Sequence, residues 1–127
     1  MSNYQSSSVK IYVCTTCRNE MGSAEKPVPG ERLLEATSHI AKEQDQDIDV
    51  VGVECLANCK RRLSAAIAKE NTWSYIFGEL SIENAQDLVK AAQLFKNSET
   101  DVMPWQGRPE ILKRNMIARF PIGSFKD

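Results

Sequence analysis

Four cysteines are the residues whose type and spacing point most directly to chemistry in this chain. They form two close pairs, Cys14-Thr15-Thr16-Cys17 and Cys55-Leu56-Ala57-Asn58-Cys59, with 37 residues between the pairs. A chain of 127 residues has enough core to fold without disulfides, and cytoplasmic thiols are normally kept reduced. If folding brings the two pairs together, they form a site of four thiolates, where we expect the function to lie.

Three chemistries use cysteines in this pattern. A [2Fe–2S] cluster needs four thiolates, usually two on each iron. A structural zinc ion also takes four, commonly as two short pairs. Dithiol exchange needs only a C-x-x-C motif near a β-α unit, which Cys14 and Cys17 provide. The spacing alone leaves the metal open, and the predicted site is the same for iron–sulfur and zinc.

Dithiol exchange fits the rest of the sequence least well. Such a dithiol gains its reactivity from a helix N-terminus, but thirteen residues from Arg18 to Gly30 separate Cys17 from the first expected helix. Thioredoxins place a cis-proline opposite their dithiol, and no proline occurs between Pro29 and Pro104. Dithiol exchange also gives no role to the second cysteine pair.

The elements before each pair explain how the four cysteines can meet. Val9–Val13 is predicted as a strand that runs into Cys14, and the β-branched segment Ile48–Glu54 as a strand that runs into Cys55. Apolar residues at helical spacing predict a helix over Glu31–Lys42 between them. A helical crossover makes the two strands parallel neighbours, so both pairs follow the same edge of the sheet.

The remainder of the chain completes an α/β order of strand, helix, three strands and helix. Two further strands are expected at Ala65–Lys69 and Trp73–Phe77, and a second helix follows the N-cap Ser81. We therefore expect a frayed tail over residues 1–8, a metal-binding domain over 9–97 and a C-terminal extension over 98–127. Prolines and glycines interrupt any long element in that extension.

This order, with one cysteine pair after each of the first two strands, resembles the thioredoxin-like [2Fe–2S] ferredoxins. The Cys14–Arg18 segment, the helix start at Pro29-Gly30 and the Cys55–Cys59 segment also resemble an uncharacterised bacterial family of predicted metal-binding proteins. The resemblance implies a thioredoxin-like fold with a four-stranded mixed sheet, two main helices and an extended C-terminal segment. It also implies a [2Fe–2S] cluster held by Cys14, Cys17, Cys55 and Cys59, with Zn²⁺ as the alternative because the first pair is more tightly spaced than in those ferredoxins.

Composition narrows the classes of partner. Sixteen Lys and Arg against seventeen Asp and Glu give a net charge of −1, so nucleic acid is not an expected partner. No apolar run approaches the roughly 20 residues of a membrane span, and no secretory segment is evident. Composition therefore favours a cytoplasmic protein, and the resemblance to [2Fe–2S] ferredoxins implies an electron carrier without catalytic residues of its own, serving a redox partner protein or a metal-dependent enzyme. The alternative is a zinc-binding protein with a structural or metal-handling role. A homodimer is compatible with the sequence.

The single histidine, the aromatic residues of one strand and the basic residues can each be explained by structure as well as by function. His39 is the only histidine and is expected on a solvated helix face. Trp73, Tyr75 and Phe77 alternate along a strand and are expected in the core or in cross-strand pairs. Basic residues flank the cysteines and would raise the potential of a cluster or simply be solvated; they are Arg18, Lys60, Arg61 and Arg62. The extension carries Trp105, Arg108, Lys113, Arg114 and Arg119, which either pack on the domain or dock an acidic partner or a neighbouring subunit.

Overall fold

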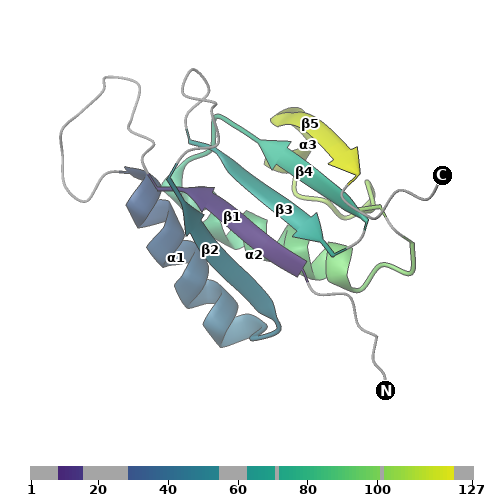
Figure 1. Ribbon diagram of the computed structural model, residues 1–127, viewed down its shortest axis with the longest axis horizontal. Coiled ribbons are helices and arrows are strands. Elements are labelled where there is room, and N and C mark those ends of the chain that lie inside the picture. The colour runs from purple at the N-terminus through teal and green to yellow at the C-terminus, as the bar shows by residue number, and fades with distance from the viewer. Residues whose placement is uncertain (1–8, 16–28, 55–62, 71, 101, 122–127) are drawn as a thin grey trace.

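A computed structural model describes residues 9–15, 29–54, 63–70, 72–100 and 102–121 (Figure 1). The elements in chain order are β1 (Val9–Cys14), α1 (Pro29–Gln44), β2 (Ile48–Val53), β3 (Ala65–Lys69), β4 (Trp73–Phe77), the 3-10 turn η3 (Ile82–Asn84), α2 (Ala85–Lys96), α3 (Ile111–Arg114) and β5 (Met116–Pro121). The expected strands and helices up to residue 96 are therefore confirmed, with ends that differ by a few residues.

The strands form one mixed sheet in the order β2-β1-β3-β4-β5. β1 and β2 are parallel, as the helical crossover predicted, and every other neighbouring pair is antiparallel. The expectation of four strands and two helices is corrected in the C-terminal segment, which forms α3 and a fifth strand rather than an extended arm. β5 pairs along β4 with a register shift at Ile76/Phe77.

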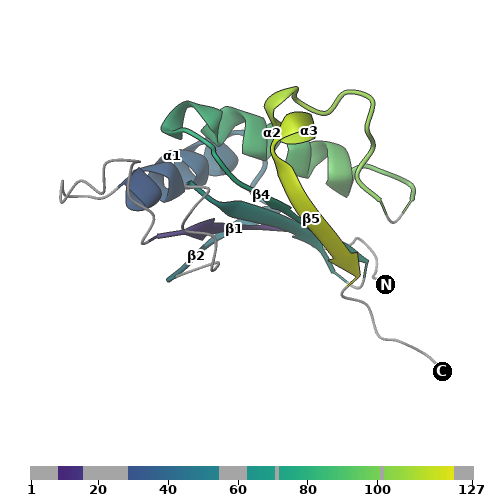
Figure 2. The same ribbon diagram turned by 90° about the horizontal axis from the view of Figure 1, so that it is seen from above.

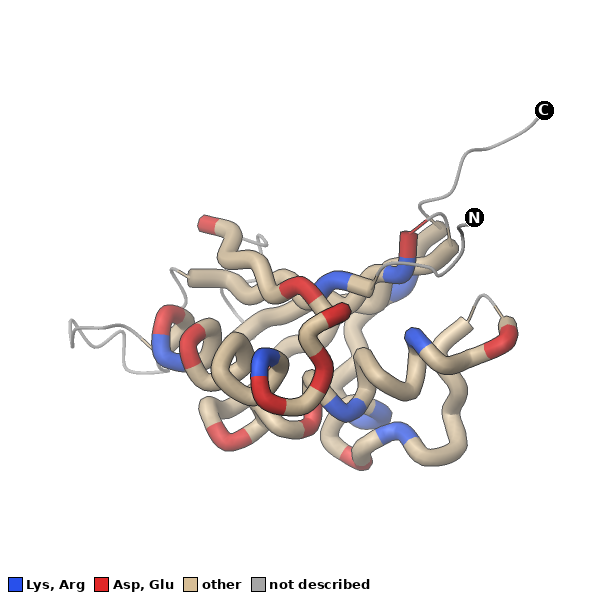
Figure 3. The backbone as a smooth tube through the Cα atoms, turned by 90° about the horizontal axis from the view of Figure 1, so that it is seen from below, with Lys and Arg blue, Asp and Glu red and all other residues tan. Residues whose placement is uncertain are grey.

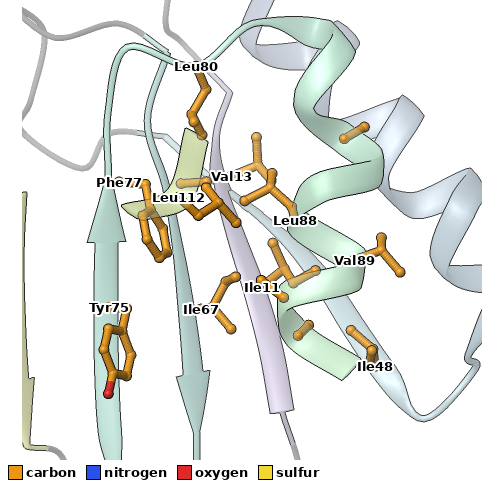
Figure 4. Close-up of a cluster of buried hydrophobic side chains, with 14 of the residues drawn as sticks. Ile11, Val13, Ile48, Ile67, Tyr75, Phe77, Leu80, Leu88, Val89 and Leu112 are labelled. Carbon is orange, nitrogen blue, oxygen red and sulfur yellow. The ribbon is translucent and has the colours of Figure 1, made fainter. Parts of the chain in front are cut away.

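Both long helices, α1 and α2, cover the same face of the sheet (Figure 2). Along β1, Val9, Ile11 and Val13 are fully buried and Lys10 between them is exposed, because successive side chains of a strand point to opposite faces. Figure 4 shows Ile11 and Val13 of β1 beside Leu88 of α2 in this core. The alternation therefore fixes which face of β1 meets the helices.

Polar contacts fix the two ends of α2. At its start, the Asn84 side-chain oxygen accepts a hydrogen bond from the Ser81 backbone N–H at 2.8 Å. Ser81 therefore caps the 3-10 turn η3, whereas the N-cap of α2 itself is Asn84, three residues after the predicted position. At its end, Lys96 lies 2.7 Å from Asp45 in the turn between α1 and β2. The hydrogen bond from Lys96 lowers the pKa of Asp45 below its ordinary value.

Lys69, the last residue of β3, is buried and ties the sheet to the segment after α2. Its ammonium donates to the carbonyl oxygens of Phe95, Ser98 and Thr100 at 3.1–3.3 Å. These carbonyls belong to the end of α2 and the residues that follow it, where carbonyls lose their helical partners. The positive charge at a helix C-terminus is also favourable toward the helix dipole.

The charges are unevenly distributed along the described chain. Figure 3 shows many of the acidic residues around α1 and the turn before β2, whereas α3 and the segment before it carry basic residues. Within the described residues, no helix combines the length and apolarity needed to cross a bilayer.

Candidate metal centre

The candidate site begins where β1 and β2 end side by side. Cys14 is the register partner of Val53, two residues before Cys55. The Cys14 backbone N–H donates to Ser64 O at 3.1 Å, and the Thr15 N–H donates to Val53 O at 2.7 Å. Cys14 is thus held between the end of β2 and the start of β3, at the edge of the sheet predicted from the crossover.

The thiol of Cys14 lies inside this junction, with 3% of the residue exposed. Its Sγ donates to the Glu54 carbonyl oxygen at 3.7 Å. That carbonyl belongs to the peptide bond that links Glu54 to Cys55. The first cysteine of one pair therefore contacts the peptide that begins the other.

Thr15 and Gly52 pack the same junction from the α1 side. The Thr15 hydroxyl donates to Val53 O at 3.0 Å. A Cβ added at Gly52 would lie 2.7 Å from Thr15 Cγ2 and 2.8 Å from Leu34 Cδ2, so this position has no room for a side chain without movement. These positioning residues were not predicted; the one signal in the sequence is a glycine inside a run of β-branched residues.

Three of the four predicted ligands, Cys17, Cys55 and Cys59, lie outside the described residues. So do Asn58 and the basic residues Arg18, Lys60, Arg61 and Arg62. The chain leaves the described region at Glu54 and returns at Leu63, whose carbonyl accepts from Leu80 N–H at 3.1 Å. Among the described residues alone, no three His, Cys, Asp or Glu side chains form a metal-binding group.

The remaining sequence predictions concern residues away from the cysteines. His39 is on the exposed face of α1, with Nε2 3.3 Å from Glu43, as expected of a solvated position. The strand aromatics are core residues as expected, because Tyr75 and Phe77 are buried and Trp73 is half-buried. Arg108 of the extension is buried against the ring of Tyr75, whereas Trp105 is exposed.

The mixed sheet with both long helices on one face makes this an α/β protein of thioredoxin-like fold, and solved structures agree. The fold is similar to that of the thioredoxin-like [2Fe–2S] ferredoxin from Aquifex aeolicus, with a TM-score of 0.57 and 13% identity over 92% of this chain and 97% of that one. A second structure of the wild-type ferredoxin gives a TM-score of 0.56 at 12% identity, covering 87% and 96% of the two chains. A cysteine-to-serine variant of it gives 0.57 at 13% identity, covering 87% and 98%.

The chain belongs to the family described as "Protein of unknown function (DUF1636)", whose model matches residues 11–122. No curated protein matches it. The match includes both cysteine pairs and reaches through β5. At 11–13% identity, the ferredoxin structures show the fold and no more.

Proposed function

We propose that this protein holds a [2Fe–2S] cluster on Cys14, Cys17, Cys55 and Cys59 and carries single electrons to a partner protein. The observation that supports this most directly is the position of Cys14. It is buried at the carboxyl end of β1 and hydrogen-bonded to the carbonyl of Glu54, the residue directly before Cys55. The thioredoxin-like fold, shared with a [2Fe–2S] ferredoxin, supports the same proposal.

Covalent geometry supports a common site for the two pairs. The Glu54 oxygen is 3.7 Å from Cys14 Sγ, and the peptide bond places the Cys55 nitrogen about 2.3 Å from that oxygen. The Cys55 backbone therefore begins within about 6 Å of the Cys14 sulfur. Two sulfurs on one tetrahedral metal with bonds of about 2.3 Å are about 4 Å apart. A cysteine that begins this close has the reach to bind the same metal as Cys14.

The residues present fit a four-thiolate group in chemistry as well as in reach. An oxidised [2Fe–2S] centre with four thiolates would carry about −2 and accept one electron when bound. The basic residues adjoining the cysteines would offset part of that charge and favour the reduced form; they are Arg18, Lys60, Arg61 and Arg62. Cys14 would contribute a sulfur held away from water by the strands on either side.

Zinc is the second candidate because the spacing of Cys14 and Cys17 is typical of zinc sites. Dithiol exchange has less support. Buried cysteines are poor redox nucleophiles, and α1 begins only at Pro29, twelve residues after Cys17.

The deciding experiment is to purify the protein without oxygen and measure iron, acid-labile sulfide and zinc per chain, together with the visible spectrum. About two irons and two sulfides, with absorption bands that bleach on reduction, are expected. One zinc per chain and no visible absorption would refute the electron-carrier proposal and support a zinc-binding protein instead.

Replacing Cys14 with Ser tests the ligand without removing its packing. A serine hydroxyl can still donate to the Glu54 carbonyl, so Cys14→Ser should fold but lose most of its metal. Thr16→Ala is the matched control, because it changes the same motif without removing a thiolate. Circular dichroism checks the fold, and metal content and spectrum check the site. A Cys14→Ser variant with the metal content and spectrum of the wild type would refute the assignment of Cys14.

A further inference from the structure

The β4–β5 side of the sheet contains a pocket that the metal proposal does not use. Its volume is about 390 Å³, and it is formed where the segment after α2 crosses back to β5. Apolar and aromatic side chains line most of it, together with two arginines. The residues that the argument uses are Tyr75, Met103, Trp105, Arg108, Met116 and Arg119.

Arg108 is a buried cation in the wall of this pocket, with 6% of the residue exposed. Its Nε donates to Pro104 O at 3.2 Å, Nη2 to Met103 O at 2.7 Å and Nη1 to Met116 Sδ at 3.7 Å. A guanidinium has five N–H groups, so two have no acceptor among the described residues. Burial lowers the pKa of Arg108, the interaction with Tyr75 offsets part of this, and the charge of Arg119 lowers the pKa again, but a guanidinium stays protonated at neutral pH.

No carboxylate within the described ranges forms an ion pair with Arg108 or Arg119. The pocket therefore places two positive charges beside each other without a compensating anion from that part of the chain. Buried charges are normally paired, because an unpaired one loses its hydration without gaining a partner. An anion in the pocket would offset the repulsion between Arg108 and Arg119 and would accept hydrogen bonds from the N–H groups of Arg108 that have no other acceptor.

Tyr75 supplies a second buried donor. Its ring is 5.3 Å from the Arg108 guanidinium, and its hydroxyl oxygen accepts the Met103 backbone N–H at 3.0 Å. The hydroxyl proton has no acceptor among the residues that the structure describes, although only 2% of Tyr75 is exposed. Since buried polar hydrogens usually find acceptors, this group also favours a ligand oxygen.

Trp105 provides an aromatic surface at the open side of the pocket. Although the residue is 58% exposed, the Arg108 guanidinium and the Lys113 ammonium each lie 5.2 Å from its ring. These cations hold positive charge beside the exposed ring, where it can attract the anionic group of a ligand whose flat body packs against Trp105. A tryptophan this exposed contributes little to the core, so its position beside the pocket points to binding.

We propose that this pocket binds a small organic carboxylate with an aromatic or apolar body. The carboxylate would accept from Arg108 and the Tyr75 hydroxyl, because a planar guanidinium suits a carboxylate's two oxygens. The apolar body would lie against Met103, Met116 and Trp105. The volume is within the range of about 300–1,000 Å³ typical of small-molecule sites.

The proposal of a carboxylate-binding pocket does not depend on the proposal of a metal site. β3 lies between β4 and β1, which carries Cys14. Loss of metal from the cysteine site therefore leaves the pocket residues in place, and either proposal can fail without the other.

The test uses benzoate as the probe, titrated into the full-length protein and followed by two-dimensional amide NMR. Two tryptophans give two separate indole N–H signals. Saturable shifts are expected at the Trp105 indole and at amides of residues 102–119. Benzyl alcohol, which has the ring without the charge, and inorganic phosphate, which has the charge without the ring, should both bind more weakly.

Substitutions locate the interaction. Arg119→Ala should weaken benzoate binding about tenfold through loss of one charge, and Arg108→Lys should weaken it while keeping a cation in the wall. Arg114→Ala is the matched control, because Arg114 is exposed and paired with Glu110 at 3.7 Å, outside the pocket. Shifts that do not saturate, equal binding of benzyl alcohol or phosphate, or an Arg119→Ala variant that binds like Arg114→Ala would overturn the proposal.

Discussion

Replacing Gly52 with Ala tests how closely the cysteine end of the sheet is packed. Gly52 does not have the positive φ that strains other residues, so alanine can adopt its backbone conformation. The obstacle is contact alone: the new methyl group would lie 2.7 Å from Thr15 Cγ2 and 2.8 Å from Leu34 Cδ2. Leu34 can move the end of a flexible side chain, but Thr15 is held by its hydrogen bond to Val53 O.

The size of the effect follows from two opposing terms. Forcing a methyl group into a packed site costs about 1–3 kcal/mol. Gly-to-Ala substitution at a compatible backbone returns about 0.4–1 kcal/mol by restricting the unfolded chain. We therefore expect Gly52→Ala to lower the free energy of unfolding by about 1–2 kcal/mol. If Cys14 holds the proposed cluster, a shift of the adjoining Thr15 should also reduce the metal content of the folded protein.

A double-mutant cycle in urea isolates the contact that causes the loss. Thr15→Ser removes Cγ2 and keeps the hydroxyl that donates to Val53. The two changes together should therefore cost at least about 1 kcal/mol less than the sum of the single changes. Val51→Ala on the same strand is the control, since Val51 is partly exposed. If Gly52→Ala is as stable as the wild type, or if the changes simply add, the packing argument is wrong.

Three further predictions concern stability elsewhere in the fold. The pKa of Asp45 is lowered, first by the hydrogen bond from Lys96. The ionised carboxylate therefore stabilises the folded protein above the ordinary pKa of 3.8, and this contribution is lost as the pH falls through the lower pKa of the folded state. In urea titrations, the difference in stability between the wild type and Asp45→Asn should shrink between pH 6 and pH 3. Tyr75→Phe should cost about 1–2 kcal/mol in urea unfolding, because the buried Met103 N–H loses its acceptor, and an unchanged midpoint would contradict this. Trp105→Ala should change stability by less than about 0.5 kcal/mol, since the ring is mostly exposed, and a larger loss would make Trp105 structural.

The sequence predicts most of this fold because local patterns and long-range packing agree up to residue 96. Val9, Ile11 and Val13 alternate with polar or half-buried residues, so one face of β1 is apolar wherever its neighbours lie. Apolar residues also recur at helical spacing after Ser81, and they are the ones that α2 buries; they are Ala85, Leu88, Val89, Ala92 and Phe95. In these segments the local preference alone specifies the element, and the crossover rule then fixes the parallel pairing of β1 and β2.

β5 could not be predicted in the same way. Met116 and Ile117 are half-buried, and the four residues from Ala118 to Pro121 are exposed, so no alternation marks a strand. Pro121 also argues against one by pattern, although a proline is tolerated at the end of an edge strand. The strand exists because β4 offers an unpaired edge, which is a property of the assembled sheet.

The candidate metal centre follows from local chain order, whereas the pocket beside β4 and β5 depends on tertiary packing. Cys14 is the last residue of β1, and the helix that follows makes β1 parallel to β2, so the position of Cys14 beside the end of β2 follows from the order of elements along the chain. The pocket instead needs β5 in register with β4, so that Arg119 lies opposite Tyr75, and it needs the segment after α2 to bring Arg108 onto the same ring. The basic residues of the pocket are visible in the sequence, but the pocket itself and the burial of Arg108 arise only once β5 has paired with β4. A site of this kind is therefore found from tertiary structure, even where every residue that forms it has already been noticed.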